Sequence, residues 1–408
     1  GGVIGERFVI AQDGSLSTPT LGTSNVRFGV NAGNSIASGG NYNTVVGDEA
    51  GTAISTGDEN VFMGYKAGQA INTSSVNVAV GFEALSTDTK GERSVAVGYR
   101  ALKTQNQISS ANADNTAVGA FAGASITTGD RTTIVGALAG DAIQGADANT
   151  VVGYEALSAN VGSELNTALG YKTLRLFNVG SGSGYNTAVG ALAGDQVTTG
   201  IENTLIGGLA GDAIQDADYN VAVGMSALTT NVLGHVSVAI GHSALKLQNP
   251  ASAGNMYNVA VGHGSGSNIT TGVQNILVGG LAGLFATTTD GSTFVGAEAG
   301  QGITGTKLTG NHNTAIGQKA GLLLQGAATN NTLVGATSGD GITTGNANTA
   351  LGGSSLTGVT TGSNNVGLGE GAGYNITSGD SNIIIGKDIT APSATLSNQI
   401  NIGNMIHN

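Results

Sequence analysis

Cysteine and tryptophan are absent from the 408 residues, and only 3 residues are proline. Without cysteine the chain can form no disulfide bond, no zinc–thiolate site and no thiol nucleophile. The scarcity of proline excludes a collagen triple helix, which also needs glycine at every third position. Charged residues make up only 10% of the chain, which excludes the Glu- and Lys-rich heptads of a coiled coil. No apolar run approaches 18 residues, so no membrane-spanning helix is expected.

The charge and the N-terminus exclude further classes. The formal net charge of −12 argues against nucleic acid as a partner, because binding to phosphates needs a basic surface. Hydrophobic residues at 39% are too many for a solvated, disordered chain. No N-terminal segment has the pattern of a signal peptide and the chain lacks an initiating Met, so we expect a processed chain or a fragment.

What the sequence has in abundance is glycine, at 70 residues, much of it in a repeat. An apolar tripeptide that ends in Gly recurs along the chain, as in VVG at 45–47 and AVG at 79–81, and its Gly sets a register of 22 units; we call the Gly of each unit the corner glycine. Fifteen of the 21 intervals between corner glycines are 17 residues, and the others are 18, 20 or 21. A period this short cannot hold two helices, but it can hold short strands and turns. The sequence therefore predicts an all-β, parallel β-solenoid (a β-roll or β-helix) of about 22 rungs.

Three residues form the strand of each unit. The residue three positions before the corner glycine is Val, Thr or Ile in all 22 units, and the residue directly before the glycine is aliphatic, Met or Phe. β-branched residues favour extended backbone, and residues two apart share one strand face. We assign that face to the interior of the rung.

The middle residue of each strand is then expected to point outward, although it is apolar in 20 of the 22 units. Arg27 and Asn401, in the first and last units, are the exceptions. A strand that is apolar on both faces is buried on both, so we expect a second copy of the chain against this residue, in a homotrimeric fibre. The predicted inter-subunit stripe includes Val45, Phe62, Ile134, Leu205, Leu277 and Phe294.

Two further positions are expected to hold the turns. Asn stands four residues before the corner glycine in 17 of the 22 units, where stacked side chains can form an amide ladder. The ladder residues include Asn43, Asn60, Asn77, Asn115 and Asn149. The corner itself is expected to require positive φ or close backbone approach. The corner glycines include Gly47, Gly64, Gly81, Gly98, Gly119, Gly136, Gly153 and Gly170.

The second half of each unit has two alternative patterns. Ala usually follows the corner glycine by three residues, and the next residue is Gly or Leu. Where it is Gly, as at Gly51, an aliphatic residue such as Ile54 follows three residues later; where it is Leu, as at Leu85, that later residue is mostly polar. The exchange is expected if the two positions fill the same interior space, because the core volume of each rung must stay constant. The longer intervals are expected to hold small loops on one edge.

Several sets of side chains are candidates for catalytic, sugar-binding or metal-binding sites. Charges alternate two residues after the corner glycine, as in Glu49 and Lys66, which indicates a stacking ladder rather than catalytic carboxylates. Aromatic residues precede these charges, including Tyr65, Phe82, Tyr99, Tyr154 and Tyr171, and such residues either pack between rungs or bind sugars. His242 and His263 share one repeat position, which leaves a metal pair open. Asp58, Asp130 and Asp380 follow turns, but the calcium-binding nonapeptide is absent. We therefore predict no catalytic residue, cofactor or metal site.

The repeats resemble a known group of proteins. Units such as NTAVGAFAGASITTGD (115–130) and NTAVGALAGDQVTTG (186–200) are similar to the repeats of bacteriophage tail-fibre and related virion-fibre proteins, over roughly 25–388. The units SVAVG (94–98) and SVAIG (237–241) resemble, more distantly, the head β-roll of trimeric autotransporter adhesins, whose units are shorter. The ending LSNQINIGNMIHN (396–408) resembles the segment upstream of the endosialidase-type intramolecular chaperone of phage fibres. The resemblance implies a chaperone that trimerises the shaft and then cleaves itself off.

The expected organisation and function follow. Residues 1–24 are expected to be an N-terminal attachment segment, 25–388 the shaft, and 389–408 a C-terminal segment left by chaperone cleavage. The chain is predicted to be a non-enzymatic fibre shaft of a phage tail or virion that holds or presents a host-receptor-binding element. Its expected partners are its own copies, other virion or tail proteins at one end, and a host surface glycan or protein.

Three alternatives remain. A cell-surface adhesin or extracellular filament is the first. An ice-binding solenoid would need a flat outward array of Thr, whereas Thr here alternates with Val at the position assigned to the interior. A polysaccharide-degrading fibre would need paired acids beside aromatic subsites, whereas the acids here alternate with bases.

Overall fold

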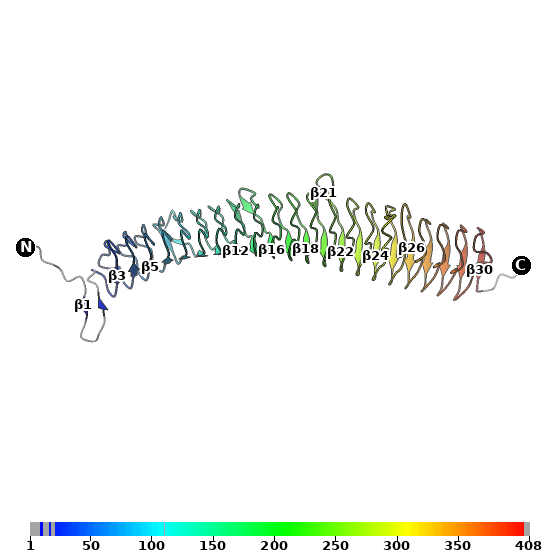
Figure 1. Ribbon diagram of the computed structural model, residues 1–408, viewed down its shortest axis with the longest axis horizontal. Helices are drawn as coiled ribbons and strands as arrows, with labels where there is room; N and C mark the ends of the chain where they lie inside the picture. The colour runs from blue at the N-terminus through cyan, green and yellow to red at the C-terminus, as the bar shows by residue number, and fades with distance from the viewer. Residues whose placement is uncertain (1–8, 11–15, 18–20, 110, 404–408) are drawn as a thin grey trace, which may run out of the picture. The chain divides into compact units, whose positions relative to one another are not determined.

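The computed structural model describes residues 9–10, 16–17, 21–109 and 111–403. Every regular element in these residues is a β-strand, and the chain divides into two compact units, residues 1–201 and 202–408. Each unit is a stack of rungs, in which a three-residue strand pairs in parallel with the strand of the next rung (Figure 1). The predicted all-β parallel β-solenoid of about 22 rungs, with its 17-residue period, is confirmed.

The described residues of the first unit form ten ladder strands. They pair so that each residue faces the residue at the same repeat position, as Thr133 faces Thr150 and Val135 faces Val152. The strands are β3 (Val26–Phe28), β4 (Thr44–Val46), β5 (Val61–Met63), β6 (Val78–Val80), β8 (Val95–Val97), β10 (Thr116–Val118), β11 (Thr133–Val135), β12 (Thr150–Val152), β14 (Thr167–Leu169) and β16 (Thr187–Val189).

The second unit continues the same pattern with twelve ladder strands. They are β17 (Thr204–Ile206), β18 (Val221–Val223), β20 (Val238–Ile240), β22 (Val259–Val261), β23 (Ile276–Val278), β24 (Thr293–Val295), β25 (Thr314–Ile316), β26 (Thr332–Val334), β27 (Thr349–Leu351), β28 (Val366–Leu368), β29 (Ile383–Ile385) and β30 (Ile400–Ile402). Because β30 pairs with β29, the ladder extends past the boundary expected at residue 388. Of the expected C-terminal segment, residues 404–408 lie outside the described residues.

Short extra sheets lie beside the ladder. Three parallel pairs bridge a longer rung and the rung before it: β7 (Gly91–Glu92) with β9 (Ala111–Asn112), β13 (Ser163–Glu164) with β15 (Gly182–Ser183), and β19 (Gly234–His235) with β21 (Gly254–Asn255). These hold the loops predicted for the longer intervals, and Figure 1 shows the β21 loop projecting from its unit. The expected attachment segment 1–24 falls mostly outside the described residues, but β1 (Val9–Ile10) and β2 (Leu16–Ser17) form an antiparallel pair.

The assignment of the strand faces was wrong, because the middle residue of each strand faces the interior. In β11, Ile134 is fully buried within the single chain, whereas Val135 is 38% exposed. Successive side chains of a strand point to opposite faces, so with the middle side chain in the core the two end side chains point outward. The predicted inter-subunit stripe is therefore part of the core of the chain itself. Its residues are all 0% exposed: Val45, Phe62, Ile134, Leu205, Leu277 and Phe294.

The second half of each rung completes this core as predicted. Ala50 and Ile54 are fully buried in one kind of rung, and Leu85 is fully buried in the other. A Cβ placed on Gly51 would lie 2.7 Å from Cδ1 of Ile54, so the two positions do compete for one space. Both Gly51 and Leu85 have positive φ, at 51° and 50°. Leu therefore adopts a backbone conformation that costs about 1–2 kcal/mol relative to the right-handed region, and its buried side chain offsets that cost.

Candidate interaction surface

The corner glycines are structural, for both of the predicted reasons. In the eight named glycines φ lies between 132° and 143°, a region that side chains disfavour. In Gly136, an added Cβ would lie 2.5 Å from the carbonyl oxygen of Gly153, the next corner glycine. Successive corners are therefore stacked too closely for any side chain.

The predicted asparagine ladder is present and lies inside the solenoid. The backbone N and Nδ2 of Asn60 both donate to Oδ1 of Asn43 at 3.0 Å, and Oδ1 of Asn60 accepts the backbone N of Asn77 at 3.0 Å. Oδ1 of Asn115 accepts the backbone N of Thr132 at 2.9 Å. The ladder thus satisfies buried amide groups at the corner before each strand. All five named members are almost completely buried: Asn43, Asn60, Asn77, Asn115 and Asn149.

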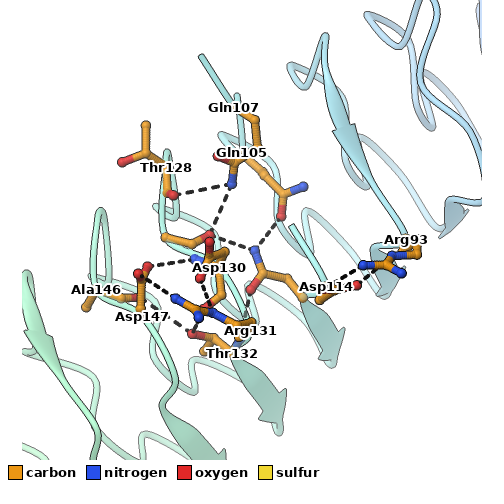
Figure 2. A network of polar contacts seen from close by, with 12 residues as sticks. Arg93, Gln105, Gln107, Asp114, Thr128, Asp130, Arg131, Thr132, Ala146 and Asp147 are labelled. Atoms are coloured by element: carbon orange, nitrogen blue, oxygen red, sulfur yellow. Dashed lines mark hydrogen bonds and ion pairs between the residues drawn. The ribbon is translucent and has the colours of Figure 1, made fainter. Parts of the chain in front are cut away.

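A second polar ladder, not predicted from the sequence, lies six residues before the corner glycine. Oδ1 of Asp147 accepts the backbone N of Asp130 at 2.9 Å, and Oδ1 of Asp58 accepts the backbone N of Asn41 at 2.6 Å. Figure 2 shows Arg131 between Asp130 and Asp147, with donor–acceptor distances of 2.6 and 3.2 Å. The recurrence of Asp, Asn or Ser at this position was the available signal. Of the three aspartates that follow turns, Asp58 and Asp380 accept backbone amides, whereas Asp130 accepts Nε of Arg131.

The charge ladder and the aromatic rows are on the surface of the rungs. Glu83 and Arg100 are 2.8 Å apart, and Glu49 and Lys66 are 3.5 Å apart. A hydrogen bond from Lys103 lowers the pKa of the Glu83 carboxyl most, and one from Arg100 lowers it further. Partial burial of the carboxyl acts in the opposite direction and raises the pKa. These pairs connect adjacent rungs, as predicted.

The aromatic rings stack between rungs. The ring centroids of Tyr65 and Phe82 are 5.1 Å apart and those of Phe82 and Tyr99 are 5.3 Å apart, with all three side chains partly exposed. His242 and His263 also stack, at 5.2 Å. Within the described residues, no group of three or more His, Asp or Glu side chains is arranged to hold a metal ion.

The residues flanking each middle residue form the outer face of the ladder, which we call the outer sheet face. One row contains Thr, Val or Ile, and the other contains mostly Val, Ile and Leu. Exposure reaches 46% at Met63 and 43% at Leu169 in the first unit, and 48% at Leu351 in the second. Isolated apolar residues are normal on a surface, but a continuous apolar row beside a mixed row of Thr, Val and Ile indicates a contact surface.

The outer sheet face, and not the middle residue, is therefore the candidate interaction surface. No protein-family model matches the chain, and a search of the curated proteins gave no match. The fold itself places the chain among parallel β-solenoid repeat proteins. None of the described residues belongs to a helix that could cross a membrane.

Proposed function

We propose that the chain is the structural shaft of a phage tail fibre or other virion fibre, which holds or presents a host-receptor-binding element. The β-solenoid fold supports a shaft, because each rung contacts its neighbours and length grows with rung number. The resemblance of the repeats to virion-fibre proteins supports the virion, with other virion or tail proteins at one end and a host surface glycan or protein as receptor. A cell-surface adhesin or extracellular filament subunit is the alternative.

The outer sheet face supports assembly of the shaft from three copies. In the described ladder strands it is the face that the single chain leaves partly exposed, and its second row is almost wholly aliphatic. Association that buries this face removes the apolar rows from water, and a closed ring of three copies leaves none of them unpaired. The Thr side chains in the first row point outward, as an ice-binding face requires, and not into the interior to which the sequence pattern assigns them. The aliphatic second row nevertheless favours contact with protein over contact with ordered water.

Self-assembly is tested by adding charge to the outer sheet face. We expect the unmodified chain to sediment as a trimer in analytical ultracentrifugation. The double variant Val118→Asp, Val135→Asp should sediment as a monomer with an unchanged β-sheet circular dichroism spectrum, because both side chains are 38% exposed in the single chain. The control Ile108→Asp, Thr128→Asp adds the same charge at exposed positions outside this face and should remain trimeric. A monomeric unmodified chain would overturn the trimer.

The virion location needs a separate test. An antibody raised against the purified chain should label fibres that project from virus particles in immunogold electron microscopy. Labelling confined to cell surfaces or to free filaments would reject the virion and support the alternative.

A further inference from the structure

A cavity of about 300 Å³ opens on the first unit, beside the charge ladder. Its lining comes from three positions, two, five and six residues after the corner glycine, on three successive rungs. The polar lining residues are Asp141, Glu155, Ser158 and Arg175, and Leu138 and Leu176 contribute apolar walls. This volume is at the lower limit of pockets that hold small ligands, and it suits a single ring-sized group.

One side chain of this cavity, that of Asp141, has a carboxylate oxygen without a hydrogen-bond partner among the described residues. Its Oδ1 is buried and has no hydrogen-bond partner within the part of the chain that the structure describes. Burial is the main cause that raises the pKa of Asp141, and the nearby charge of Glu155 raises it further. Buried polar atoms are nearly always paired in folded proteins, so a ligand hydroxyl that donates to Oδ1 once the Asp141 side chain turns toward the cavity would fill an open position.

The charges around the cavity disfavour an anionic ligand. Arg175 is held by Asp195 through two bonds of 2.7 and 3.1 Å, and Lys172 lies 3.4 Å from Glu155. Both cations are therefore already engaged by carboxylates. Asp141 adds a third carboxyl group to Asp195 and Glu155, so acidic side chains outnumber basic ones around the cavity. The site therefore does not attract phosphate, sulfate or an acidic sugar.

Two tyrosines lie outside the cavity lining and directly precede Glu155 and Lys172 in the chain. Tyr154 and Tyr171 stack with ring centroids 5.8 Å apart and are 43% and 49% exposed. A hydrogen bond with Tyr154 is the main reason that the pKa of Glu155 is lowered. Nζ of Lys172 lies 5.3 Å from the ring centroid of Tyr171. The tyrosines are thus joined to the cavity lining through Glu155, and they add an exposed aromatic surface with polar tips.

We propose that this cavity, together with the exposed rings of Tyr154 and Tyr171 that contact Glu155 and Lys172, is a binding site for a neutral saccharide. A sugar ring supplies hydroxyl donors for Asp141 and Glu155, and its C–H faces match the aromatic and leucine surfaces. Because such a ligand is uncharged, its binding brings no unpaired charge into the cavity. This inference depends on the geometry of the first unit and not on the fibre-shaft proposal, so either can fail without the other.

The test uses four neutral oligosaccharides as probes: maltohexaose, cellohexaose, mannohexaose and chitohexaose. Binding to the full chain is measured by isothermal titration calorimetry, with hexagalacturonate as the anionic comparison. We expect at least one neutral probe to bind, and Asp141→Ala and Tyr171→Ala each to weaken it about tenfold or more. Glu155→Gln provides a second variant should Asp141→Ala not fold, as judged by circular dichroism.

Matched controls come from the same repeat positions elsewhere. Asp340 occupies the position of Asp141 in a rung of the second unit, and Tyr99 occupies the position of Tyr171 in another rung of the first. Asp340→Ala and Tyr99→Ala should leave affinity unchanged. The proposal is overturned if no neutral probe binds, if only the anionic probe binds, or if the control variants weaken binding as much as the cavity variants do.

Discussion

Replacing Gly136 with Val is expected to destabilise the first unit by about 4 kcal/mol or more, at the upper end of single-residue effects. Two independent effects contribute to this loss of stability. The φ of 135° is unfavourable for any residue with a side chain, and worst for a β-branched one. The new Cβ would also lie 2.5 Å from the carbonyl oxygen of Gly153, so β11 and β12 could not keep their spacing.

Hydrogen exchange and denaturant titration measure this effect, because a stack of repeats can open locally without unfolding as a whole. Protection should be lost first in the amides of β11 and β12. Ala137→Val adds the same side chain at the next position, where other rungs carry Tyr65 or Phe82, and it should cost less than about 1 kcal/mol. If both variants were equally stable, the close stacking of the corners would be wrong.

Phe62→Ala is expected to cost about 3–5 kcal/mol, because it leaves a cavity in the core. Phe62 is 0% exposed, and its ring lies against Gly68, where an added Cβ would be 2.6 Å from ring atoms. Its neighbour Met63 points to the other side of the same strand and is 46% exposed. Met63→Ala should therefore cost less than about 1 kcal/mol in a chain that does not self-associate.

The comparison of these neighbours is best made in the Val118→Asp, Val135→Asp background, so that contacts between copies do not contribute. Denaturant midpoints and slopes then report on the single chain. A larger loss for Met63→Ala than for Phe62→Ala would mean that the strand faces are reversed, with the middle residue outward.

Much of the fold could be predicted from the spacing of a few residue types. The recurrence of the corner glycine every 17 residues predicted the rung, because stacked rungs must repeat the same turn at the same place. The asparagine ladder followed from identical side chains at identical positions, and so did the exchange between Leu85 in one rung and Ile54 in another. These features depend on sequence period and side-chain volume, which a single chain displays directly.

The direction of the strand faces was decided only by the tertiary structure. In most strands the middle residue and the residue after it are both apolar, so hydrophobicity could not distinguish Ile134 from Val135. The ladder at Asn115 held the missing signal: its buried amide lies two residues before the middle residue, and residues two apart share a face. Because Asn is usually exposed, its position was assigned to a turn rather than to the core.

The candidate site also required the structure. Asp141, Glu155 and Arg175 belong to three different rungs, and a sequence shows each only as one charge in a repeat. Which polar atoms are already paired depends on the side chains of neighbouring rungs, as Asp195 pairs with Arg175 and leaves Oδ1 of Asp141 without a partner among the described residues. The repeat period by itself therefore determined the solenoid and its rung. Burial, charge pairing and the surface left for contact depended on how the rungs pack in three dimensions.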